Sequence, residues 1–331
     1  MSKARELSQR AGVDGALSNR NMVINGNFSV WQRGTSASGL TTGQVFVADR
    51  WSTTSSGGYT NISRQEFSNG QTDVPNASYF LRHDIATAPD YVHIDHRVED
   101  LRRFDGQTVT ASFWAKASSN MTLGFEFVSG HGVGGTVEVN GNYAPYNKGS
   151  FAVTTAWQKF TATVTTTSLA GKSLGASHCF ITRFIPSSGS AYRSRWGGQS
   201  FVGQFDLAQV QLEYGDTVTP FEHRSFTDTL QACQRYYQFN GSEQGRSSPA
   251  GDRAAFALHF SPEMRAAPTI TLVNSTNAID DMYTSQRSVT GVTGTYGRAT
   301  TQGIGVEFSC STTGNKGHSL FSKTISFDAE L

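Results

Sequence analysis

The chain has 331 residues, a formal net charge of +1 and three cysteines. Its hydrophobic fraction is 37% and its charged fraction is 16%, and 34 glycines and many small polar residues take up the difference. This composition is typical of short strands joined by many turns and does not suit a helix bundle. The near-zero net charge provides no basic surface for nucleic acid, so nucleic-acid binding is not expected.

The cysteines and the hydropathy pattern exclude further classes. Cys179, Cys233 and Cys310 are widely spaced and form no CxxC pair, which disfavours a disulfide framework or a zinc site. The first two are expected to be small buried side chains. The first ten residues, "MSKARELSQR", lack the apolar region of a signal peptide, and no apolar run is long enough to span a membrane. We expect a protein made in a cytoplasm, with no membrane insertion and no cofactor.

Residues 1–21 differ from the rest of the chain. They are polar, are interrupted by Gly12 and Gly15, and are too short to fold alone. They form either a disordered tail or an attachment segment that becomes ordered against a partner chain.

Residues 22–224 have the pattern of a β domain. In 107–117, Val109, Ala111, Phe113 and Ala115 fall on one face of a strand and polar residues and Trp114 on the other. The turn-rich spacing of the strands predicts a jelly-roll β-sandwich. A helical turn is expected within 97–104. The expected strands are 22–33, 58–67, 78–87, 91–98, 107–117, 123–129, 136–139, 157–166, 177–185 and 204–214.

Residues 225–331 are expected to form one short helix and a smaller β-rich C-terminal domain. The helix, 225–240, begins with Ser225 and Asp228 in a pattern close to a capping box. Strands are expected at 253–260, 269–274, 303–310 and 323–331. One apolar stripe at helical spacing could pack around a three-fold axis or bury within the chain, and it consists of Phe226, Leu230, Cys233 and Tyr237.

The sequence carries no catalytic signature. GxSxG, HExxH and phosphate-loop motifs are absent, and the glycine-rich stretch 129–142 is best interpreted as a hairpin or loop. His93 and Asp95 share one face of a strand while His96 points the other way, so a metal site is not expected there. Paired carboxylates could be drawn from a larger set, but spacing places no two of them together: Glu66, Asp73, Glu99, Asp100, Asp206 and Glu213. We therefore expect a protein that is not an enzyme.

Two aromatic segments are candidate sugar-binding sites, since rings beside hydrogen-bonding groups stack on the apolar face of a sugar. Residues 191–200 are expected to be a loop that carries Tyr192, Arg193, Arg195 and Trp196. Residues 142–149 add Tyr143 and Tyr146. The alternative, which the sequence favours, is that these rings clamp loops onto the sandwich or pack against a neighbouring subunit.

Four stretches together resemble the structural and receptor-binding proteins of tailed bacteriophages. They are "NMVINGNFSVWQRGTS" (21–36), "FVADRW" (46–51), "QTVTASFWAKA" (107–117) and the block from 205 to 237, in which "QLEYGDTVTPFE" and "CQRYY" are the most specific parts. "FSPEMRAAPTITL" (260–272) is similar to the part that follows this block in many of these proteins. The resemblance covers nearly the whole chain from about residue 20.

The resemblance implies a jelly roll like that of a carbohydrate-binding module, often trimeric, mounted on the virion and facing the host surface. It transfers no catalytic residue. In this setting 22–32 is expected to be the first strand, paired with 205–214, with Gln211 and Glu213 bonded to Asn25 and Asn27. Trp31 is expected to close one end of the sandwich rather than to bind a ligand.

The function expected from the sequence is a short trimeric tail fibre that contacts a host surface glycan, with residues 1–21 docked on an adaptor or other virion protein. The short N-terminal segment also suits a tip that docks on another protein. Two alternatives are a capsid decoration or appendage protein and a polysaccharide depolymerase. The depolymerase is disfavoured because no long β-helical repeat is visible.

Overall fold

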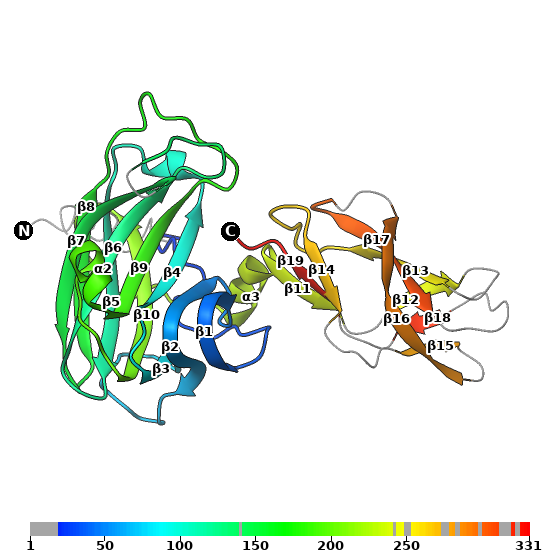
Figure 1. Cartoon of the computed structure of the whole chain (residues 1–331), viewed down its shortest axis with the longest axis horizontal. Coiled ribbons are helices and arrows are strands. Elements are labelled where there is room, and N and C mark those ends of the chain that lie inside the picture. The colour runs from blue at the N-terminus through cyan, green and yellow to red at the C-terminus, as the bar shows by residue number, and fades with distance from the viewer. Residues whose placement is uncertain are drawn as a thin grey trace, which may run out of the picture. The chain divides into compact units, whose positions relative to one another are not determined.

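The computed structural model describes residues 19–138, 141–240, 243–247, 253–272, 278–281, 285–296, 300–310, 319–321 and 325–331 (Figure 1). It divides into two compact units, one reaching Thr229 and including Leu331, and the other spanning Leu230–Glu330. The boundary expected between residues 224 and 225 falls just before this division. Within the described residues, no helix is long and apolar enough to cross a membrane.

The first unit is a jelly-roll β-sandwich, as its alternating strands predict, and all of its strand pairs are antiparallel. A 3₁₀ turn, η2 (Leu101–Phe104), and a helix, α2 (Ser190–Trp196), interrupt the strands. The strands are β1 (Ser36–Phe46), β2 (Trp51–Glu66), β3 (Tyr79–Thr87), β4 (Tyr91–Glu99), β5 (Thr108–Ala117), β6 (Met121–Gly130), β7 (Tyr143–Val153), β8 (Gln158–Thr165), β9 (Cys179–Ser188) and β10 (Gly203–Tyr214).

Nine of these strands follow one path, β7-β6-β9-β4-β2-β3-β10-β5-β8, which folds over at the middle of β2, and β1 pairs with β2. The first half of β2 pairs with β4 and the second half with β3. Between the halves, Gly57 and Gly58 have φ of 64° and 68°, and a Cβ on Gly58 would lie 2.7 Å from the Thr87 carbonyl oxygen. Only glycine fits this corner. We call β7, β6, β9, β4 and the start of β2 the first layer, and β3, β10, β5 and β8 the second layer.

The core between the two layers is rich in phenylalanine. Phe113 of the second layer lies 5.7 Å from Phe125 and 4.9 Å from Phe184 of the first, measured between ring centroids. Val109, Ala111, Phe113 and Ala115 are fully buried, which confirms the face predicted for them. Cys179 and Cys233 are buried, as expected.

Strand β10 departs from the strict alternation that its sequence suggests. Its register with β5 shifts between Ala208 and Gln211, and Gln209 has φ of 43°. Such a bulge adds one residue, so the core-facing set changes from Phe205 and Leu207 to Val210 and Leu212. Strict alternation along 204–214 predicts that Phe205, Leu207, Gln209, Gln211 and Glu213 share one face, and the bulge makes this prediction wrong beyond Ala208.

The predicted first strand, 22–33, is not a strand. It makes a turn near Asn25, yet it lies along β10, where the Met22 amide donates to the Leu212 carbonyl (2.8 Å) and the Val210 amide donates to the Gly26 carbonyl (2.9 Å). The segment thus adjoins the last strand as expected, without forming a ladder. Trp31 is 8% exposed and packs within the hydrophobic core.

The side-chain bonds expected between this segment and β10 are also absent. Glu213 accepts hydrogen bonds from the amide and hydroxyl of Thr219, and Gln211 accepts one from the Glu222 amide. Asn25 instead bonds within its own turn, accepting from the Val30 amide. Asn25 thus forms hydrogen bonds within its own turn, and Gln211 and Glu213 of β10 form theirs with the chain that follows β10.

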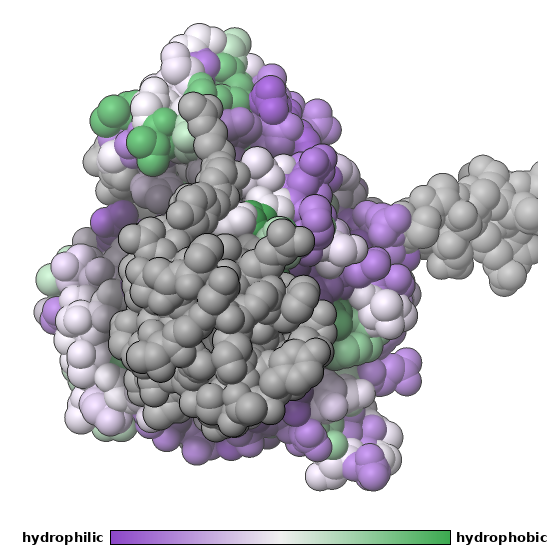
Figure 2. Space-filling model, turned by 90° about the vertical axis from the view of Figure 1, so that its right-hand side faces the viewer, coloured by the Kyte–Doolittle hydropathy of each residue, from purple (hydrophilic) through white to green (hydrophobic). Residues whose placement is uncertain are grey.

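Other elements differ from the prediction where hydrophobicity is low. β1 and β7 were not expected, and the described part of 136–139 belongs to the connection between β6 and β7. The glycine-rich stretch 129–142 is thus a hairpin connection, as predicted. In this connection Val133 and Val137 are 80% and 74% exposed. Figure 2 shows hydrophobic residues gathered at the upper end of the molecule.

The second unit is β-rich and begins within the helix α3 (Phe226–Gln234). One sheet has the order β11-β19-β14, and a closed barrel has the order β12-β13-β17-β16-β15-β18. Residues 1–18 of the predicted attachment segment lie outside the described residues, as do 273–274 and 323–324 of two predicted strands. The strands are β11 (Tyr237–Asn240), β12 (Glu243–Ser247), β13 (Arg253–His259), β14 (Thr269–Leu272), β15 (Ala278–Asp281), β16 (Ser285–Tyr296), β17 (Gly303–Cys310), β18 (Ser319–Phe321) and β19 (Ile325–Asp328).

The helix is shorter than the predicted 225–240, because the chain leaves it after Gln234 and Tyr237 begins β11. In the proposed oligomer stripe, Phe226 is 58% exposed and Leu230 is half-buried. Cys233 and Tyr237 are buried at 0% and 7%. Phe226 is thus the most accessible member of the stripe.

Candidate functional site

The segment 190–196, expected as a loop, is the helix α2. Gly189 precedes it in an extended conformation and Gly197 ends it with φ of 68°, so these glycines cap a helix rather than loosen a loop. Trp196 is 3% exposed and stacks on Tyr192, with ring centroids 5.2 Å apart. Both rings also meet Tyr91 edge-on. Trp196 therefore packs α2 onto the first layer and is not an open platform.

The two arginines of α2 differ in their surroundings. Arg195 places its guanidinium carbon 4.7 Å from the centre of the Trp196 ring. Arg193 is exposed. Tyr192, Arg193 and Arg195 remain accessible or half-buried at the surface of α2.

A row of buried charges lies on the outer face of the first layer. Arg183 of β9 donates to Asp95 of β4 (2.8 and 2.9 Å) and to Glu126 of β6 (2.8 Å). The three are 8%, 0% and 2% exposed. Burial alone would raise the pKa of Asp95, but Arg183 and His93 outweigh it and hold that pKa well below its usual range. Burial raises the pKa of Glu126 against the opposing effect of Arg183. Since every charge has a partner inside the sheet, the row is a structural network.

His93 and Asp95 lie side by side, with Nδ1 and Oδ1 3.0 Å apart, and His96 faces away and accepts from the Ile24 amide (3.1 Å). The predicted geometry of this stretch is confirmed. Burial lowers the pKa of His93 despite the nearby Asp95. No group of three or more His, Cys, Asp or Glu among the described residues is placed to hold a metal ion.

The other two predicted aromatics lie on β7, apart from the α2 rings. Tyr143 is 41% exposed and lines a hollow of about 430 Å³ together with Gly132 and Asn142. Tyr146 packs against the core, and its hydroxyl lies 3.0 Å from the Thr167 hydroxyl. The six candidate glycan-binding residues of the two segments therefore lie in three places.

A different surface of the sandwich is hollowed. Three hollows, of about 570, 450 and 300 Å³, follow one another along the outer side of the second layer. The first and second share Asn76 and Tyr79, and the second and third share Gln209 and His223. We call the three hollows together the groove. One wall is the β2–β3 connection, residues 67–78, and the other is the segment 220–226.

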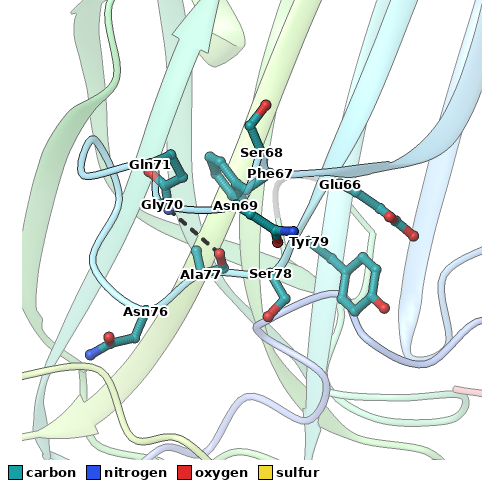
Figure 3. Close-up of a pocket in the computed structure, with 10 residues that line it drawn as sticks. All are labelled: Glu66, Phe67, Ser68, Asn69, Gly70, Gln71, Asn76, Ala77, Ser78 and Tyr79. Atoms are coloured by element: carbon teal, nitrogen blue, oxygen red, sulfur yellow. Dashed lines mark hydrogen bonds between the residues drawn. The ribbon is translucent and has the colours of Figure 1, made fainter.

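The first hollow lies within the β2–β3 connection (Figure 3). Gln71 holds this connection in shape, because its amide donates to the Val74 carbonyl (2.7 Å) and accepts from the Val74 amide (3.0 Å). Val74 is fully buried. Figure 3 shows Asn69 and Tyr79 gathered at one side of the hollow and Asn76 turned the other way. The connection thus presents amide side chains from a fixed backbone.

The bulge residue Gln209 forms part of the groove between the second and third hollows. It is 4% exposed, and its side-chain amide donates to the Pro75 carbonyl (2.5 Å). A glutamine with positive φ is strained, and bulges of this kind re-aim side chains beside functional sites. Gln209 therefore couples the strand to the wall of the groove.

The third hollow contains a ring beside a cation. Trp114 of β5 and Lys159 of β8 are register partners, so their side chains are neighbours on the same face. Trp114 is half-buried and Lys159 is exposed. Phe221 and His223 form the opposite wall, with ring centroids 5.0 Å apart. Partial burial lowers the pKa of His223.

Sequence reasoning missed the groove. The available signal was Trp114, a large ring on the polar face of an alternating strand. Tyr79 and Gln209 gave no signal, since one reads as a strand residue and the other depends on a bulge. The groove can hold a linear ligand against aromatic rings, amide side chains and a cation.

No family model matches the sequence, and no curated protein matches it. Solved structures are similar at low identity. A tailspike protein of bacteriophage CBA120 has a TM-score of 0.36 and 12% identity, with 59% of this chain and 22% of that chain covered. The C-terminal family 22 carbohydrate binding module of Clostridium thermocellum Xyn10B has 0.31 and 12%, with 52% and 89% covered. A cyclase from Fischerella sp. TAU has 0.35 and 11%, with 60% and 98% covered. The match thus spans about a fifth of the tailspike, and at these scores the three likenesses assign no function.

Proposed function

We propose that this chain is a non-enzymatic, carbohydrate-binding structural protein of a tailed-phage virion, a short trimeric tail fibre that contacts a glycan on the host cell. The observation that carries the binding role is the groove, in which Tyr79 and Trp114 lie along one surface with amide side chains between them. Pyranose rings stack their apolar faces on aromatic rings, while planar amides bond to the hydroxyl groups.

The lining of the groove supports binding over hydrolysis. Glycoside hydrolysis commonly uses two carboxyl groups on either side of the scissile bond. Among the described residues that line the three hollows, Glu66 is the only one with a carboxylate, and it lies at one end of the groove. A single exposed carboxylate suits a hydrogen-bonding role.

The virion role rests on the sequence resemblance. The "QLEYGDTVTPFE" and "CQRYY" runs are its most specific parts, and the first of them ends within the segment 220–226 that forms one wall of the groove. In this proposal the protein is made in the host cytoplasm, residues 1–21 dock on an adaptor or other virion protein, and Leu230 of α3 contributes to the trimer seam. Labelling intact particles with an antibody tests the location, because a signal on the head would assign the chain to decoration instead.

The binding role is tested with purified envelope polysaccharide of the host and isothermal titration calorimetry. We expect Trp114→Ala to weaken binding by about tenfold or more, since loss of one stacking ring costs about 1.4 kcal/mol or more. Tyr59→Ala, at a ring that is 44% exposed and outside the groove, is the matched control and should bind as the parent does.

A second control separates the groove from the sequence-based site. Tyr192→Ala removes a ring of α2 on the opposite face and should leave affinity unchanged. Full affinity in Trp114→Ala together with a loss in Tyr192→Ala would move the site to α2. Release of oligosaccharide during incubation would overturn the non-enzymatic role.

A further inference from the structure

Charge is distributed unevenly along the groove. Glu66 stands at the end of the first hollow. The described residues that line the second and third hollows include Lys159, His223 and Arg224 but no aspartate or glutamate. One end of the groove is therefore acidic and the other is basic.

The cations at the basic end are held differently. Arg224 donates to the Asn21 carbonyl (2.6 Å) and lies 3.3 Å from Glu222, so its charge is partly compensated. Glu222 is directed at Arg224 and at the Asn21 amide (2.8 Å), away from any role as a lining group. Lys159 is exposed and forms no salt bridge with another described residue. Its ammonium group can pair with a ligand at little cost.

The position of Lys159 specifies the kind of ligand. Because Lys159 is the cross-strand partner of Trp114 and both line the third hollow, the two side chains are neighbours on one face of the sheet. A sugar stacked on Trp114 would direct a substituent at the edge of its ring toward the Lys159 ammonium group. Ser112, next along the same face of β5, and His223 on the opposite wall supply further hydrogen-bonding groups.

We propose that the Trp114–Lys159 end of the groove binds an anionic sugar, so that the ligand is an acidic polysaccharide. The inference deepens the proposed function and rests on it. A charged hydrogen bond to Lys159 selects such a sugar over its neutral counterpart. A uronic acid carboxylate and a sulfate or phosphate ester share this chemistry, and the experiment below distinguishes them.

The test uses the full chain and a panel of bacterial envelope polysaccharides, each assayed in its native form, after carboxyl reduction and after mild removal of ester-linked phosphate. Binding is measured by biolayer interferometry. We expect tighter binding to acidic members than to neutral ones, and a fall of about tenfold or more when the anionic group is removed. Loss on carboxyl reduction identifies a uronic acid, and loss on dephosphorylation identifies a phosphate ester. Parallel assays with dextran sulfate and dextran test for a sulfate ester.

Variants connect the effect to one side chain. Lys159→Gln should weaken binding to the acidic member about tenfold and bring it close to the affinity for its neutral derivative, and Lys159→Arg should restore most of the difference. Lys172→Gln is the matched control, since Lys172 lies outside the groove and bonds to Glu138 (2.6 Å). Equal melting temperatures show that the variants fold.

The outcomes separate the two proposals. Tight binding to neutral members, or acidic binding that Lys159→Gln leaves unchanged, overturns the acidic-ligand inference and leaves glycan binding intact. Absence of binding to every member, including the polysaccharide of the host, overturns the proposed function and the inference with it.

Discussion

On the first layer of the sandwich, Tyr192 and Trp196 stack on one another over a row of buried charges, and Trp196 is 3% exposed. On the second layer, Tyr79 and Trp114 line open hollows, beside amides held by a fixed loop. Both faces combine aromatic rings with basic side chains and carboxylates. The difference is a seven-residue helix, α2, which covers the first face, whereas a bulge and two walls leave the second face hollow.

This contrast shows what assigns a role to an aromatic residue. A ring that meets other rings of the same chain has already satisfied its apolar surface, and a ring beside an unfilled hollow has not. The closed face should therefore respond to mutation through stability, and the open face through affinity. The predictions below test that separation.

The largest effect is expected at the buried charges of the closed face. Arg183→Met leaves the carboxylates of Asp95 and Glu126 without their shared cation, which should cost about 3–5 kcal/mol of unfolding free energy. Urea denaturation measures the loss. Replacing all three, as Arg183→Met with Asp95→Asn and Glu126→Gln, should recover much of it. A single variant as stable as the parent would show that the row is not a coupled network.

Acid should destabilise the second layer, which carries the groove, because the layer buries His83. Burial lowers the pKa of His83 to about 3 from 6.5, so between these values the unfolded chain binds a proton that the folded chain does not. The stabilisation is therefore complete above pH 6.5 and is lost as the pH falls, by about 3 kcal/mol at pH 4. His83→Gln should narrow the stability gap between pH 7 and pH 4 by this amount. An unchanged gap would show that His83 does not titrate in this range.

A smaller effect is expected at the bulge. Gln209→Gly relieves the strain of the positive φ but removes the hydrogen bond to Pro75. The gain and the loss of unfolding free energy are each about 1 kcal/mol and oppose one another, so the melting temperature should stay near that of the parent. Glycan affinity should fall about fivefold, because the wall of the groove is released. Gln209→Ala keeps the strain and should lose both stability and affinity. Unchanged affinity in both variants would remove Gln209 from the site.

Alternation predicted the jelly roll because side chains on opposite faces of a strand differ in burial. Val109 to Ala115 on β5 show how directly a period of two reports the core. The same reasoning failed where a bulge or a turn interrupts the regular backbone of the strand. The bulge at Gln209 depends on the neighbouring strand, and the turn at Asn25 replaces a strand that the local pattern suggests.

The groove could be predicted less well than the fold, since it depends on three segments that are distant in sequence. Residues 67–78, Gln209 and 220–226 meet only after β3 has paired with β10 in the second layer. Glycines near α2 suggested a flexible loop, but they cap a helix and thereby bury Trp196. Strands of low hydrophobicity, such as β1 and β16, also escaped prediction because threonine, serine and glycine make them resemble loops.

The most direct test of the account is a crystal structure of the chain with a bound fragment of the host polysaccharide. The account predicts a sugar ring stacked on Trp114, with its neighbours running past Gln209 toward Tyr79. A sugar bound instead against Tyr192 on α2, or at Tyr143 on β7, would contradict the assignment of the second layer as the binding face.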